Sequence, residues 1–189
     1  VVDDDFVKPK VDYVALAGYR RAIANFVNIV TNRSDIKVRY QKNGDSYTDG
    51  KVVTIGSKID EKNFDHVVGL ALHEGSHILL SDFNFLRNLK QNTPEEVFIL
   101  GEDLGYSRNE SLGHLKNMLN YVEDRRIDYY VFSNSPGYKG YYHAMYDKYF
   151  HSNAITKALR DNTFGNEPTL ENYMNRIINF TNKESDLDA

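Results

Sequence analysis

One apolar stretch of the sequence carries two histidines and a glutamate in the spacing His-Glu-x-x-His, and no other stretch constrains the chain as much. The stretch is Ala71–Leu80, and it holds His73, Glu74 and His77. Residues four apart lie on one face of an α-helix, about 6 Å apart at their Cβ atoms. His73 and His77 can therefore direct imidazole nitrogens at one ion, at the distance of about 2.0–2.1 Å typical of zinc. Glu74 would lie beside the ion, where a carboxylate can take a proton from a water bound to the metal.

The residues around this motif predict a mostly buried helix, from about Glu61 to Ser81. Two histidines and a glutamate are costly to bury without partners, so a bound metal explains the pattern better than hydrogen-bonded core histidines do. Gly69 and Gly75 within the helix suggest the close approach of another backbone, although a simple loss of helix propensity explains them equally well. The apolar flanking residues are Val67, Val68, Leu70, Leu72, Ile78, Leu79 and Leu80.

A catalytic zinc site needs a third protein ligand, because the metal takes three and keeps one position for water. The chain has no cysteine, so the ligand must be a histidine or a carboxylate. The remaining histidines do not stand at the spacing of the long metzincin motif, which requires glycine and histidine where this chain has Leu80 and Phe83. The acid-rich segment 119–128 is the better source of the ligand.

Two acids of this segment compete for the third position. Glu123 shares a helix face with Asn120 and Ile127, and this favours an inward orientation, so Glu123 is the preferred ligand. Asp124 is the alternative, with Asp128 on the same helix face as a supporting acid. An exposed helix with acid–arginine pairs is the third interpretation of the segment.

The two motifs together resemble the gluzincin branch of the zincin metallopeptidases. Segment 119–128 is also similar to the Asn-x-x-Glu-Asp-x-Arg-Ile-acid signature of bacterial and phage metallopeptidase domains that accompany von Willebrand A domains and cobaltochelatase-like subunits. The resemblance covers about residues 11–150. The chain departs from well-studied gluzincins at Ile127, where they often carry an acid, and this keeps Asp124 open as the ligand.

The resemblance implies a zinc-dependent metallopeptidase that acts on polypeptides. It implies one zinc ion per chain, held by His73, His77 and Glu123, with Glu74 as the catalytic base. Tyrosine and histidine side chains of segment 137–143 could donate hydrogen bonds to the oxyanion, although packing is the favoured role for them. The alternative function is a metal-stabilised scaffold or binding domain, with weak or no hydrolysis, that works beside a von Willebrand A-type domain in the same or a partner chain.

Charge and hydropathy narrow the classes of partner that the chain is expected to bind. The net charge is −4 and the charges of both signs are interspersed, which argues against nucleic acid and against an anionic membrane surface. No signal peptide and no run of 18 apolar residues is evident, so we expect a cytoplasmic protein. The sequence lacks an initiator methionine, and we expect residues 1–189 to be a single domain from a longer protein.

Helical periodicity and turn signals predict the other elements and an α+β class: a mostly helical, zincin-like domain with a small hairpin or sheet before the motif helix. The two strands should pair as a hairpin, and the second strand should offer an open edge to an extended substrate. Thr93 and Pro94 should cap and open a short helix. The predicted elements are an extended lead-in over 1–10, helices over 11–31, 94–100, 111–132, 141–159 and 168–180, and strands over 36–40 and 51–56.

Overall fold

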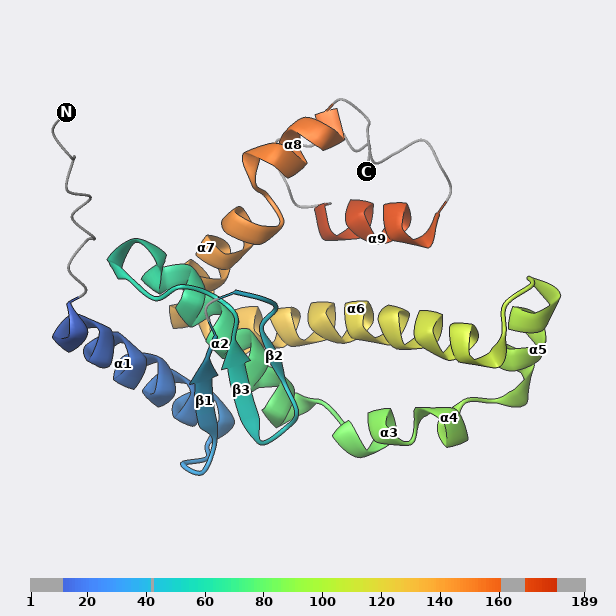
Figure 1. Ribbon diagram of the computed structural model, residues 1–189, viewed down its shortest axis with the longest axis horizontal. Coiled ribbons are helices and arrows are strands. Elements are labelled where there is room, and N and C mark those ends of the chain that lie inside the picture. The colour runs from blue at the N-terminus through green and yellow to red at the C-terminus, as the bar shows by residue number, and fades with distance from the viewer. Residues whose placement is uncertain (1–11, 42, 161–168, 180–189) are drawn as a thin grey trace, which may run out of the picture.

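The computed structural model describes residues 12–41, 43–160 and 169–179, so the predicted lead-in over 1–10 lies outside the described residues. The fold is mostly helical with a small three-stranded mixed sheet before the motif helix, as the sequence predicts (Figure 1). No helix of the described ranges is long and apolar enough to cross a membrane. The elements are α1 (Tyr13–Thr31), β1 (Lys37–Tyr40), β2 (Tyr47–Thr48), β3 (Val52–Ile55), η1 (Glu61–Asn63), α2 (Phe64–Leu80), α3 (Phe83–Arg87), α4 (Leu89–Asn92), α5 (Glu95–Asp103), α6 (Arg108–Asn134), η2 (Pro136–Tyr138), α7 (Lys139–Tyr149), α8 (Asn153–Arg160) and α9 (Leu170–Ile178).

Helix α2 carries the motif and forms the centre of the fold, packed against α1 and α7. A Cβ atom built on Gly69 would lie 2.4 Å from the carbonyl oxygen of Tyr141, and one built on Gly75 would lie 2.7 Å from Cγ1 of Val30. Gly69 therefore allows the backbone of α7 to approach closely, which confirms the predicted close approach at this position, whereas Gly75 makes room for a side chain of α1.

The sheet has the order β1-β3-β2, with β1 parallel and β2 antiparallel to β3. The predicted hairpin between 36–40 and 51–56 is therefore wrong, because these two segments run in the same direction. The predicted open edge of the second strand is also wrong, since β3 is paired on both sides. Strand β2 is the edge strand that pairs with β3 on the side opposite β1. The sequence assigned the residues of β2 to a turn region.

A turn at Asp49–Gly50 explains this difference. The Asp49 carboxylate accepts hydrogen bonds of 2.8 Å from the backbone N–H groups of Lys51 and Val52. Gly50 has a φ of +89°, a left-handed conformation that glycine adopts without strain. The chain therefore reverses directly before β3, and β2 becomes its hairpin partner.

Helix α6 is 27 residues long and begins earlier than predicted, after a capping box formed by Ser107 and Glu110. Thr93 does not cap α5 as predicted, because its hydroxyl donates to the carbonyl of Leu89 at 2.6 Å and so closes α4. The predicted helix over 141–159 is two helices, α7 and α8, separated at Phe150 to Ser152.

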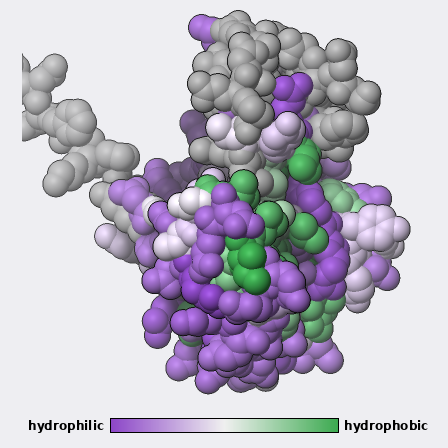
Figure 2. Space-filling view, turned by 90° about the vertical axis from the view of Figure 1, so that its right-hand side faces the viewer, coloured by the Kyte–Doolittle hydropathy of each residue, from purple (hydrophilic) through white to green (hydrophobic). Residues whose placement is uncertain are grey.

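Helices α3, α4, α5 and the first half of α6 form an arm that extends from the sheet and α2 (Figure 1). The α5 helix leaves Ile99 and Leu100 50% and 60% exposed. Figure 2 looks at this end of the molecule and shows hydrophobic residues at the centre of a largely hydrophilic face.

Candidate metal centre

Three ligand atoms from two helices converge on one point. His73 and His77 lie one turn apart on α2, and Asp124 lies on α6. The two Nε2 atoms are 3.3 Å apart. The Asp124 Oδ1 atom lies 3.6 Å from Nε2 of His73 and 3.2 Å from Nε2 of His77. For bonds of about 2.0–2.1 Å at tetrahedral angles, two zinc ligands lie about 3.3–3.4 Å apart. The observed triangle of ligand atoms therefore has the size that a zinc ion requires.

The other ring nitrogen of His73 is held by a buried acid. Its Nδ1 atom lies 3.1 Å from Oδ1 of Asp128, and a carboxylate can only accept, so Nδ1 is the donor. Asp128 is itself fixed, because it accepts a short hydrogen bond from the Tyr146 hydroxyl and pairs with the Arg125 guanidinium at 3.0 Å. These contacts fix the orientation of the His73 ring and direct its Nε2 atom at the centre.

A second chain of contacts holds His77. Its Nδ1 atom lies 3.0 Å from Oγ of Ser81, and that hydroxyl donates to Glu123 at 2.5 Å. Arg126 pairs with Glu123 at 2.6 Å and also donates to the carbonyl of Leu80 at 2.7 Å. The Ser81 hydrogen is used on Glu123, so Ser81 accepts from Nδ1 of His77. The Nε2 atom of His77 is therefore directed at the centre as well.

The Asp124 carboxylate faces both histidines. Its Oδ2 atom lies 3.4 Å from the amide nitrogen of Asn120, while Oδ1 is buried and receives no hydrogen bond. Two imidazole nitrogens and a carboxylate oxygen thus face one another at one point. Positive charge at this point, carried by a proton on an imidazole or by a metal ion, stabilises the carboxylate.

The contacts between the histidines and the acids shift the pKa values of both. Burial lowers the pKa of His73, but the contacts with the carboxylates of Asp124 and Asp128 outweigh burial and raise the pKa to about 10. Burial raises the pKa of Asp124, and the contacts with His73 and His77 reverse this effect and hold the pKa of Asp124 well below its usual range. These acids therefore favour positive charge at the centre.

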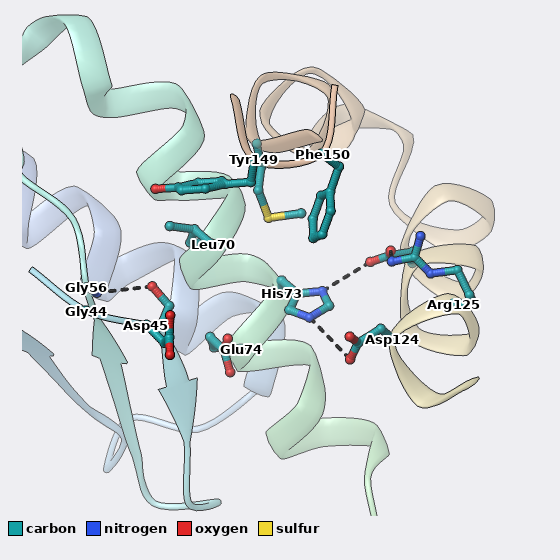
Figure 3. Close-up of a pocket in the computed structure, with 13 residues that line it drawn as sticks. Gly44, Asp45, Gly56, Leu70, His73, Glu74, Asp124, Arg125, Tyr149 and Phe150 are labelled. Carbon is teal, nitrogen blue, oxygen red and sulfur yellow. Dashed lines mark hydrogen bonds and ion pairs between the residues drawn. The ribbon is translucent and has the colours of Figure 1, made fainter. Parts of the chain in front are cut away.

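Glu74 lies beside the three ligand atoms and takes no part in holding the histidines. Its side chain is 8% exposed and lies on the side of the sheet, whereas Asp124 lies on the side of α6 (Figure 3). Burial raises its pKa above the usual value for a glutamate, which the positive charge of His73 and His77 partly offsets. No described side chain donates a hydrogen bond to this carboxylate. A buried carboxylate with a raised pKa is suited to accept and return a proton near neutral pH.

A cleft of about 770 Å³ opens onto this group of residues and is lined by β2 along one side. A smaller pocket of about 250 Å³ adjoins it and contains His73, Glu74 and Asp124 together with an apolar wall (Figure 3). That wall consists of Leu70, Met145, Tyr149 and Phe150. The cleft leaves room for an extended chain beside the candidate metal centre.

The structure brings together three of the predicted site residues, His73, Glu74 and His77. It groups Asp124, the alternative acid, with the two histidines, and it connects the preferred acid, Glu123, to His77 through Ser81. Sequence reasoning missed Ser81, which directly follows α2. Asp82 accepts hydrogen bonds from two backbone N–H groups of α3.

The aromatic residues after α6 pack against other aromatic rings, and packing is the role that the sequence favoured for them. Tyr138 and Tyr141 contact the ring of Phe26, and His143 contacts the ring of Phe132. Tyr142 is fully buried, with its ring centroid 6.4 Å from that of His73.

The chain matches no protein-family model, no curated protein and no solved structure.

Proposed function

We propose that this protein is a zinc-dependent metallopeptidase with a zincin-like centre. The observation that carries the proposal is the triangle of His73 Nε2, His77 Nε2 and Asp124 Oδ1, with sides of 3.2–3.6 Å, next to the buried carboxylate of Glu74. Two histidines, one carboxylate and an adjacent free carboxylate form a donor set that suits catalytic zinc.

Asp124 is the third ligand in this proposal, in place of Glu123. Both oxygens of Glu123 already face Arg126, and one also accepts from Ser81. Asp124 Oδ1 has no such partner and faces both histidines. Glu123 then acts through Ser81 to fix the ring of His77, which is the role that Asp128 has for His73.

Bound zinc supplies two effects at such a centre, a lowered pKa of a coordinated water and polarisation of the substrate carbonyl. Glu74 accepts the proton of the attacking water and delivers it to the leaving amine, so that one carboxylate serves as base and then as acid. Asp128 and the Ser81–Glu123 pair keep both Nδ1 atoms protonated throughout. The apolar wall of the small pocket and the burial of Glu74 limit the access of bulk water.

A polypeptide is the substrate that fits the cleft. Strand β2 is an edge strand that lines the cleft, and a peptide in extended conformation can pair with such an edge. Pairing through the main chain would hold the scissile bond near the ligand atoms without regard to most of the substrate sequence.

Hydrolysis of casein tests the proposal. The purified protein should bind about one zinc ion per chain and cleave casein, and Glu74→Gln should abolish cleavage while it retains zinc. Equal cleavage by Glu74→Gln and the wild type would contradict the role of Glu74, and absence of bound zinc would contradict the metal centre.

A metal-stabilised binding domain is the second candidate, and the exposed apolar residues of α5 favour it. Ile99, Leu100 and Leu104 are each at least half exposed at the end of the arm. Under this alternative, a partner such as a von Willebrand A-type domain would cover them. The casein experiment separates the two functions, since the alternative predicts bound zinc with wild type and Glu74→Gln equally inert.

A further inference from the structure

A second pocket opens off the cleft, and the mechanism proposed above does not use it. It has a volume of about 360 Å³ and lies between the end of α2, α3 and the middle of α6. It shares part of its lining with the cleft, so a chain bound in the cleft passes its mouth. The shared residues are His77, Ser81, Leu86, Lys116 and Asn120.

Four apolar side chains that are partly exposed to solvent form part of the wall of this pocket. Leu80 and Leu119 line it from α2 and α6, and Phe85 and Leu86 line it from α3. Helix α3 buries none of its residues, and it leaves Phe85 and Leu86 about 40% exposed, at 41% and 39%. Apolar surface left in contact with water beside a binding cleft gains free energy when an apolar group covers it.

The charged groups inside the pocket already have partners within the protein. Glu123 and Arg126 neutralise each other at 2.6 Å, and the Ser81 hydroxyl donates to Glu123. The Asp82 carboxylate caps α3. A charged side chain that entered the pocket would lose water without gaining a free partner among these groups, whereas an apolar side chain would lose nothing. Lys116 lies where the pocket meets the cleft, so its charge belongs to the mouth.

We propose that this pocket is a specificity subsite that takes one bulky apolar side chain, such as leucine, methionine or phenylalanine, from the polypeptide bound in the cleft. The identity of the occupant as part of a substrate rests on the proposed function, whereas the affinity of the pocket for an apolar side chain does not. The volume is sufficient for an aromatic ring.

Binding of N-acetyl-phenylalaninamide to the full chain tests the pocket without any need for hydrolysis. The methyl signals of Leu80 should shift in a saturable way in NMR spectra, with an affinity about tenfold or more above that for N-acetyl-alaninamide. Leu119→Arg should remove the shift because it fills the pocket with a charge. Leu100→Arg is the matched control, since Leu100 is 60% exposed on α5 outside the pocket, and it should leave the shift unchanged. Leu86→Ala, at an exposed position, gives a second variant that should weaken binding without a risk to folding.

Cleavage-site mapping on casein then connects the pocket to the substrate. The wild type should cut beside bulky apolar residues, and Leu119→Arg should lose that preference. If the phenylalanine probe binds at Leu80 but no casein is cut, the proposed function fails and the apolar pocket stands. If casein is cut but the probe causes no saturable shift, or a glutamate amide binds as well as the phenylalanine amide, the pocket inference is overturned and the proposed function stands.

Discussion

Glu123 and Asp124 are neighbours in the sequence, yet a rotation of about 100° around the helix axis gives them different environments. Asp124 Oδ1 faces two histidines and is buried without a hydrogen bond. Glu123 is held by Arg126 and Ser81. The choice between a ligand and a supporting acid is thus made by the direction of a single side chain.

Exchange of each acid for its amide separates these roles. Asp124→Asn should weaken zinc binding by more than about 100-fold, because it removes a charged ligand atom. Glu123→Gln should weaken it by about tenfold, because the contact through Ser81 only orients His77. Competition with a chelator of known affinity measures both changes. A larger loss in Glu123→Gln than in Asp124→Asn would show that Glu123 is the ligand.

The sequence identified His73, Glu74 and His77 because their spacing has meaning on any helix. It favoured Glu123 over Asp124, whereas in the structure Asp124 faces the histidines, because both faces of that helix segment carry apolar residues and acids. The orientation of α6 relative to α2 decides which acid faces the histidines, and this depends on tertiary packing. Ser81 was missed because a lone serine after a motif carries little signal.

At the scale of the element, helix α2 was predicted from the sequence, whereas shorter elements were not. Its apolar run and glycines predicted a buried helix with close neighbours, and the contacts of Gly69 and Gly75 confirm this. The short strand β2 and the helix α3 were not predicted, since elements of two and five residues have too few positions to show a period. Both of them line the cleft, so the site was predicted less completely than the fold.

Alanine at two glycine positions tests the packing of α2. Gly69→Ala should destabilise the protein by about 1–3 kcal/mol, because the new methyl group would lie 2.4 Å from a backbone oxygen of α7. Gly113→Ala in α6 is the matched control, since nothing lies within 4 Å of a Cβ built there. This variant should stabilise by up to about 1 kcal/mol through helix propensity. Urea unfolding of both variants measures the changes, and a stabilising Gly69→Ala would contradict the close approach of α7.

At the scale of the whole molecule, a buried histidine away from the candidate metal centre makes the folding stability depend on pH. His66 on α2 is 6% exposed and lies 2.5 Å from the amine of Lys148 on α7. Burial, with a smaller contribution from Lys148, lowers the pKa of His66 to about 4. The unfolded chain binds a proton at this residue near the ordinary pKa of about 6.5. Between these values the unfolded state therefore holds the extra proton, and folding stability falls as the pH falls.

Replacement of His66 by glutamine should remove this dependence. The metal-free wild type should lose on the order of 2 kcal/mol between pH 6.5 and pH 4.5 beyond the loss shown by His66→Gln. Glutamine keeps an acceptor for Lys148 but does not titrate. Urea unfolding with a chelator present, at both pH values, gives the comparison. Equal pH dependence in the two proteins would contradict a neutral buried His66.

The central claim is that His73, His77 and Asp124 hold one zinc ion, and anomalous scattering from a crystal grown with zinc tests it most directly. A single peak at the zinc absorption edge should lie about 2.0–2.1 Å from the two Nε2 atoms and from Asp124 Oδ1. The peak should be lost in a crystal of Asp124→Asn and kept in one of Glu123→Gln. An absence of any peak between the two histidines, or a peak bound by Glu123 instead, would contradict the account.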